Sequence, residues 1–242
     1  MDVRFRVITI KERRSLMIAR REITIMLLLV SVLLIGSCAK KTPPTMTGAE
    51  KTTTSIQAVE GDIKAMTSQI NTTNASLNQV IQLKGTPAAK TAFDAYSKNV
   101  SDMDKAAAAF IKDSDQMTAR GTDYFREWTK SGETYTNPQI QQLSEERRSQ
   151  LMNTFSQIAG PSSGVKDRVN SYLSQIKEIK TYLSNDLSGT GIDAITPVAQ
   201  KTINDGQQII IDAQPMLAAA EQARAQIGEI GAATGGVSSL GE

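Results

Sequence analysis

The stretch TSIQAVEGDIKAMTSQINTTNASLNQV, residues 54–80, decides the fold. Eight of its positions are separated alternately by three and four residues, and seven of the eight are apolar. They are Ile56, Val59, Ile63, Met66, Ile70, Thr73, Leu77 and Val80. This spacing places the eight side chains along one narrow stripe of an α-helix, which is the pattern of coiled-coil packing. Residues 54–80 are therefore predicted to form a long helix that packs lengthwise against other helices.

The same spacing continues along most of the chain. It predicts further helices over residues 87–128, 138–158, 165–183 and from about 192 to 230. At a rise of about 1.5 Å per residue, the helix over 87–128 alone measures about 60 Å. No stretch alternates between apolar and polar residues over a useful length, so no strand is predicted. We therefore predict an all-α fold, an elongated antiparallel helical bundle or coiled coil of four to five helices over residues 54–230.

Glycine and proline mark the predicted ends of these helices. In Lys84-Gly85-Thr86-Pro87, the glycine suits a helix C-cap, the threonine the next N-cap, and the proline the first helical turn. The sequence GPSSG at 160–164 predicts another break, and Pro215 predicts a kink because proline removes an amide from the helix. Small residues on the predicted stripes, which let helices approach closely, are Ala107, Ser114, Gly121, Gly206 and Ala213.

A different pattern precedes the bundle. Residues 17–38 read MIARREITIMLLLVSVLLIGSC, with two arginines, an apolar run from Ile23 to Ile35, and small residues before the single cysteine of the chain. A basic segment, a short apolar segment and small residues before a cleavage point are typical of a secretory signal peptide. The run is shorter than the ~20 residues that a membrane-spanning helix needs. We predict that residues 1–37 are a signal peptide, and we hypothesise that translation begins at Met17, because the basic segment that follows it is more typical of a signal peptide than residues 1–16.

The ending Ile35-Gly36-Ser37-Cys38 resembles the lipobox of bacterial lipoproteins. This resemblance implies that Cys38 is the lipid attachment site: its sulfur receives a diacylglyceryl group and its amine an acyl chain such as palmitate. Two or more acyl chains are sufficient for stable anchoring in a membrane. Because Ala39 rather than aspartate follows the cysteine, the resemblance further implies an outer membrane lipoprotein that faces the periplasm. Residues 38–53 are predicted to be a flexible tether and residues 231–242 a flexible tail.

The charge of the chain argues against nucleic-acid binding. Of the 27 basic and 25 acidic residues, residues 1–37 hold seven and three, which leaves a mature chain with 20 and 22 and a net charge of −2. Nucleic-acid binding needs a clustered basic face, which an almost neutral chain with interspersed charges does not supply.

Catalytic groups are scarce in this sequence. The chain has no histidine, which excludes histidine-based triads and histidine-ligated metal sites. The pairs Asp102/Asp104 and Asp113/Asp115 stand two residues apart on predicted helices, where their side chains point away from each other. The side chains of Glu145 and Glu146, which are adjacent in the sequence, also point away from each other on a helix. We expect these carboxylates to be solvated, and we predict no catalytic residue, no cofactor and no metal site.

Aromatic and charged residues gather at one place, Arg126, Glu127, Trp128 and Tyr135. A surface patch there could bind a partner or a glycan. The interpretation that we favour is that Trp128 closes the end of an apolar stripe, because it falls on the three-four spacing.

A second resemblance rests on Phe125-Arg126-Glu127-Trp128, Tyr135-x-Asn137, the region of Ser144 and Leu151, and Tyr182-Leu183-x-Asn185-x-Leu187. These motifs resemble an uncharacterised family of bacterial envelope lipoproteins with an all-helical domain of unknown function. The resemblance covers roughly residues 118–230. It implies a helical fold and a place in the cell envelope, and it gives no information about an activity.

We expect a non-catalytic structural or interaction role rather than an enzyme. The bundle, anchored in the membrane through Cys38, would present its surface to an envelope protein or to peptidoglycan. The alternative is a bundle that rearranges to remodel or perforate a membrane. That alternative needs an apolar hairpin able to enter lipid, and the best candidates, residues 106–111 and 208–211, are far shorter than a membrane span.

Overall fold

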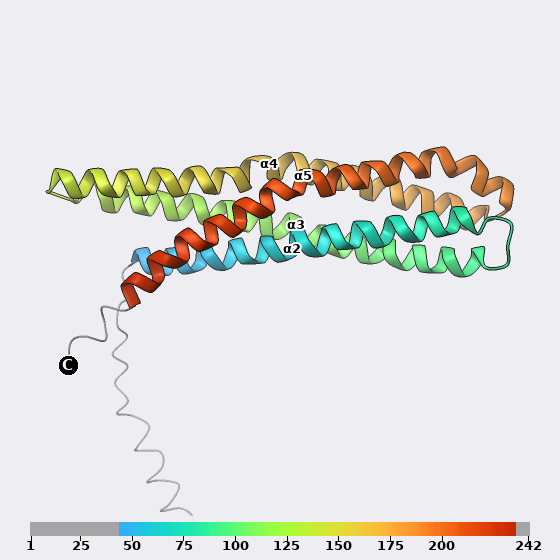
Figure 1. Ribbon diagram of the computed structural model, residues 1–242, viewed down its shortest axis with the longest axis horizontal. Coiled ribbons are helices and arrows are strands. Elements are labelled where there is room, and N and C mark those ends of the chain that lie inside the picture. Colours follow the sequence, from blue (N-terminus) through green and yellow to red (C-terminus); the bar gives the residue numbers. More distant parts are fainter. Residues whose placement is uncertain (1–43, 236–242) are drawn as a thin grey trace, which may run out of the picture. The chain divides into compact units, whose positions relative to one another are not determined.

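Four long helices make up the structure, a computed structural model that describes residues 44–235 (Figure 1). They are α2 (Pro44–Gln82), α3 (Ala89–Gly132), α4 (Pro138–Asn185) and α5 (Gly189–Gly235). Residues 44–235 contain no strand. The predicted all-α bundle is therefore confirmed, and it has four helices.

The four helices lie lengthwise against one another. α2 packs against α3 and α5, and α4 packs against the same two helices. Short connections make successive helices antiparallel, as Figure 1 shows. The longest helix, α4, has 48 residues, which corresponds to about 72 Å at the usual rise per residue. The predicted elongation of the bundle is confirmed.

The stripe predicted over residues 54–80 forms the side of α2 that faces the other helices. All eight of its side chains are buried, none more than 1% exposed. Burial of each large apolar side chain contributes about 1.5–3 kcal/mol before the entropy of folding is subtracted. The core is therefore a long, thin line of such contacts.

No helix within residues 44–235 has both the length and the apolar character needed to cross a membrane.

Buried hydrogen bonds fix the register of the helices. Asn74 of α2 donates through Nδ2 to the carbonyl of Ile203 at 3.1 Å and accepts from the hydroxyl of Tyr172 at 2.8 Å. Tyr96 of α3 donates to the carbonyl of Ile176 of α4 at 2.8 Å. Burial raises the pKa of both tyrosines well above the ordinary value. Because a slip of one helix would leave these buried groups unpaired, they specify one alignment.

The small residues on the stripes allow close packing, as predicted. All five are buried. A methyl group added at Gly206 would lie 2.8 Å from Asn74 Nδ2 and 2.9 Å from Tyr172 Cε2. The side chains that set the register therefore occupy the space that this glycine leaves.

The start of the first helix corrects one prediction. α2 begins at Pro44, so the flexible tether predicted over 38–53 is wrong for residues 44–53. Ala49 and Thr52 are buried there, and Gly48 lies against the ring of Tyr124. Packing against α3 therefore stabilises a segment whose composition suggested a mobile chain. The predicted signal peptide, Cys38 and the rest of the tether lie outside the described residues.

The connection between α2 and α3 agrees with the prediction in part. Gly85 has a φ of +70°, the conformation that suits a glycine after a helix. Thr86 was predicted to cap the next helix, but its hydroxyl donates to the carbonyl of Leu83 at 2.7 Å. Ala88 is the N-cap of α3 instead, so the prediction of Thr86 as N-cap and Pro87 as first helical residue is wrong by two residues.

The break predicted at 160–164 is wrong. α4 is continuous through this segment and contains Pro161. Ile158, Ser162 and Val165 are buried at spacings of four and three, so the apolar stripe keeps its phase across the segment. Burial on both sides therefore offsets the local preference of glycine and proline for a turn. The third and fourth predicted helices are one helix.

The last helix is longer at both ends than predicted. α5 begins at Gly189, where the Ser188 side chain accepts a hydrogen bond from the amide of Gly191 at 3.0 Å and caps the helix. It continues to Gly235, so the predicted tail is helical up to that residue. Residues 236–242 lie outside the described residues. Pro215, where we predict a kink, lies inside α5, and Figure 1 shows that α5 changes direction along its length.

Candidate functional site

An aromatic cluster lies where α3 and α4 approach the connection between them. It consists of Tyr124, Phe125 and Trp128 of α3 with Phe155 of α4. The ring centroids of Tyr124 and Trp128 are 5.6 Å apart, and those of Phe125 and Phe155 are 5.7 Å apart, both in edge-to-face geometry. Such pairs contribute about 0.5–1.5 kcal/mol beyond the area that they bury. The cluster holds this end of the hairpin together.

Two glycines let neighbouring chain segments approach the aromatic cluster. A methyl group added at Gly121 would lie 2.1 Å from Cζ of Phe155, so the ring sits directly on the glycine backbone. A methyl group added at Gly48 would lie 3.2 Å from Cδ2 of Tyr124. Burial raises the pKa of Tyr124 to about 12, although Arg147 acts against the rise. Tyr124 is therefore a neutral packing residue at physiological pH.

Two hydrogen bonds link α3 to α4 next to the aromatic cluster. Trp128 Nε1 donates to Ser144 Oγ at 2.9 Å, and Arg148 Nη1 donates to Thr129 Oγ1 at 2.5 Å. Trp128 is half-buried and packs against the core. This agrees with the interpretation that Trp128 closes the end of an apolar stripe.

Beyond the aromatic cluster, the hairpin tip, residues 130–144, exposes apolar side chains. Tyr135 is 41% exposed, Ile140 48% and Leu143 66%. Ile140 and Leu143 are apolar residues of the helix predicted over 138–158, and at this end of α4 they are exposed. Both lie on the same face of α4 as the buried Leu151, which follows Ile140 by about three helical turns and Leu143 by about two. Between Leu143 and Leu151 the half-buried positions of α4 are Ser144, Arg147 and Arg148, so polar side chains separate the exposed apolar residues from the buried stripe.

The tip is exposed because α2 and α5 do not extend over it. Gly48, one turn inside α2, lies against Tyr124, and the carbonyl of Gln226 in α5 accepts from Arg147 Nη2 at 3.3 Å. Figure 1 shows the α3–α4 turn extending past the start of α2 and away from the end of α5. The hairpin tip therefore stands free of both α2 and α5.

Three of the four aspartates that we expected to be solvated, Asp102, Asp104 and Asp115, lie in ion pairs at the surface. Asp102 accepts from Lys98 at 2.6 Å and from Lys105 at 3.0 Å, and these hydrogen bonds lower its pKa. Asp104 pairs with Lys177 at 2.6 Å and Asp115 with Lys166 at 2.5 Å, each bridging α3 to α4. The two members of each aspartate pair therefore have different partners, as the sequence predicts, but Asp113 is half-buried next to Asp62, so the expectation that it is solvated is wrong.

Glu145 and Glu146 also have separate partners. Arg148 Nη2 donates to Glu145 at 3.1 Å, and Gln142 donates to Glu146 at 2.9 Å. Sequence reasoning missed one pairing of carboxyls, that of Asp62 on α2 with Asp113 on α3. Burial first, and then the charge of Asp113, raise the pKa of Asp62. The two residues stand on different helices, so no local spacing relates them.

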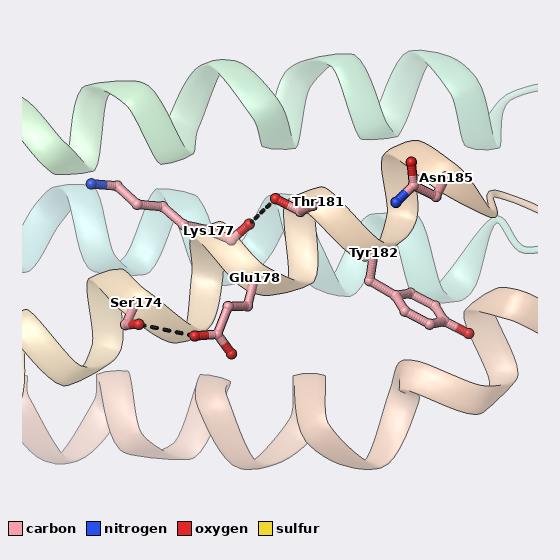
Figure 2. A pocket seen from close by; sticks show the side chains of 6 residues that line it. All are labelled: Ser174, Lys177, Glu178, Thr181, Tyr182 and Asn185. Atoms are coloured by element: carbon pink, nitrogen blue, oxygen red, sulfur yellow. Dashed lines mark hydrogen bonds between the residues drawn. The ribbon is translucent and has the colours of Figure 1, made fainter.

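A shallow hollow on the outer face of α4 has a volume of about 450 Å³ and is lined by a single helix (Figure 2). Ser174 donates to Glu178 at 3.0 Å, Thr181 donates to the carbonyl of Lys177 at 2.9 Å, and Lys177 pairs with α3. In Figure 2, Lys177 and Glu178 point in different directions. Ser174, Glu178, Thr181 and Lys177 are therefore engaged in local hydrogen bonds and an ion pair, and they do not converge on a reacting atom. The remaining lining residues are Tyr182 and Asn185.

Over the part of the chain that the structure describes, no group of three or more potential ligands gathers to hold a metal ion. Cys38, the predicted lipid attachment site, lies outside that part.

Comparison with known proteins finds one family. Residues 45–229 match the model of a family described as "Protein of unknown function (DUF2959)". The match covers nearly the whole bundle and extends further toward the N-terminus than the resemblance over 118–230. No match was found among curated proteins or among solved structures.

Proposed function

The chain belongs to the DUF2959 family of unknown function, and we propose from its own residues that it is a lipid-anchored protein of the cell envelope. The observation that carries the proposal is the sequence of residues 17–38. An apolar run preceded by two arginines ends in Ile-Gly-Ser and the single cysteine of the chain. Those features are typical of a signal peptide, and the ending resembles a lipobox.

The proposed anchor is the sulfur of Cys38. The diacylglyceryl group and the amide-linked acyl chain supply at least two chains, which is the number that stable anchoring requires. By the same resemblance, Ala39 after the cysteine favours the outer membrane and its periplasmic face.

The proposed role is structural or interactive and not enzymatic. The chain has no histidine, and Asp102, Asp104 and Asp115 engage in separate surface ion pairs. A long bundle offers a large surface for contact. We propose that this surface contacts an envelope protein or peptidoglycan.

The test compares the native protein with Cys38→Ala in cells, using acyl-chain labelling and membrane fractionation. Ser37→Ala serves as the matched control, because it alters the neighbouring residue and keeps a small side chain before the cysteine. We expect label and outer membrane fractionation for the native protein and the control, and neither for Cys38→Ala. Equal labelling and fractionation of all three proteins would contradict the proposal.

In-cell crosslinking followed by mass spectrometry then tests the role. Recovery of one envelope protein, or of peptidoglycan fragments, with the native protein supports an interaction role. The alternative function, remodelling or perforation of a membrane, predicts release of a trapped dye from liposomes by the purified protein. Dye release at stoichiometric concentrations would replace the structural role with that alternative.

A further inference from the structure

The topology of the bundle places particular segments at one end. α2 runs from Pro44 to the connection with α3, α3 returns, α4 runs out again and α5 returns. The start of α2, the α3–α4 hairpin tip and the end of α5 therefore share one end of the bundle, while the α2–α3 and α4–α5 connections share the other (Figure 1).

The proposed anchor joins the bundle at the end that carries the hairpin tip. Cys38 precedes Pro44, the first residue of α2, by six residues. Whatever its conformation, a segment of that length spans at most about 20 Å. A lipidated Cys38 would therefore keep this end of the bundle close to the membrane surface.

The chemistry of the hairpin tip suits the interface between water and lipid. Its only charged residues are Lys130 and Glu133, although 21% of the chain is charged. Tyr135, Ile140 and Leu143 are its exposed apolar side chains. Aliphatic side chains enter the boundary of the acyl chains, and a tyrosine places its ring there with its hydroxyl among the headgroups.

We propose that the α3–α4 hairpin tip docks on the membrane that holds the anchor and inserts Tyr135, Ile140 and Leu143 into its interface. This inference rests on the proposed lipid anchor. The anchor supplies a high local concentration of lipid surface, so a small apolar tip is sufficient for a second contact. Two contacts at one end hold the bundle upright on the membrane.

A second copy of the chain fits the tip less well than a membrane does. The three partly exposed side chains offer on the order of 300 Å², whereas a stable protein interface buries about 800 Å² on each partner. A membrane surface needs no such minimum, because the acyl chains on Cys38 already supply the main binding energy.

The test uses the lipidated protein. Because the lipid occupies the sulfur of Cys38, a cysteine introduced elsewhere is the one thiol that a fluorophore can label. We would introduce Leu143→Cys at the tip and, as the matched control, Val198→Cys near the other end of the bundle. Val198 is also an apolar and exposed residue, 49% exposed. Each variant is labelled with an environment-sensitive fluorophore and reconstituted in vesicles of phosphatidylethanolamine and phosphatidylglycerol. Ile140→Cys provides a second tip variant, and circular dichroism verifies that each variant is helical.

We expect a blue-shifted emission at position 143 and several-fold stronger quenching by nitroxide-bearing lipids there than at position 198. Equal, weak quenching at both positions in vesicle-bound protein overturns the docking of the tip and leaves the anchor intact. Equal, strong quenching overturns it as well, because the bundle would then lie along the membrane. Protein that separates from the vesicles overturns the anchor and this inference together.

Discussion

Alanine in place of Gly121 would introduce a methyl group into space that the ring of Phe155 occupies. The new Cβ would lie 2.1 Å from Cζ, 2.5 Å from Cε2 and 2.6 Å from Cε1 of that ring. Phe155 is buried, at 6% exposure, so the ring or one helix must move. Overpacking of a core typically costs about 1–3 kcal/mol, while alanine gains about 1 kcal/mol in helix propensity over glycine. We expect a net loss of up to about 2 kcal/mol.

A second glycine of the bundle provides the matched control. Gly61 is exposed in α2 and has nothing within 4 Å of the position where a Cβ would be added. Gly61→Ala therefore has the gain in helix propensity without the steric cost, and it should stabilise the protein by about 0.5–1 kcal/mol. The two substitutions are chemically identical and should shift stability in opposite directions.

Urea denaturation followed by circular dichroism measures both changes. The slope of the unfolding free energy against urea should remain constant, so that a shift of the midpoint reports stability. Combining Gly121→Ala with Phe155→Leu should lower the cost of the alanine, because the smaller side chain vacates part of the space. Stabilisation by Gly121→Ala, equal to that by Gly61→Ala, would refute the close packing of α3 on α4.

Three further substitutions test other features, each by urea denaturation. Pro161→Ala should stabilise the protein by about 1–3 kcal/mol, because α4 is continuous there and proline is costly inside a helix; destabilisation would indicate a break. Tyr172→Phe should cost about 1–2 kcal/mol, because Asn74 loses a buried donor; an unchanged midpoint would contradict that hydrogen bond. Asp62→Asn should stabilise the protein at pH 7, because burial and Asp113 raise the pKa of Asp62 and so favour its neutral form. That gain should shrink as the pH falls to 3.8, the ordinary pKa of aspartate, and below, because Asp62 then takes up a proton in the unfolded chain as well; a gain independent of pH would contradict the raised pKa.

The sequence predicts the helices and most of the core because both follow from local spacing. The side chains from Ile56 to Val80 face one way on any regular helix, and a partner must cover them. The same argument misjudges residues 160–164. There the local preference of Gly160 and Pro161 for a turn competes with a stripe that continues from Ile158 to Val165, and burial of the stripe is stronger.

Periodicity also identifies the face of a helix without indicating how far its neighbours extend. Ile140 and Leu143 lie on the apolar face of α4 and are exposed, because α2 and α5 do not cover them. The contacts of Asn74 with Tyr172 and of Asp62 with Asp113 join different helices. They depend on the relative register of those helices, which no local pattern specifies.

The central claim is the lipid on Cys38, and mass spectrometry of the mature N-terminal peptide from cells tests it most directly. The account predicts a peptide that begins at Cys38 and carries a diacylglyceryl group on sulfur and an acyl chain on its amine. A peptide that includes residues 17–37, or one that begins at Cys38 without lipid, would contradict it.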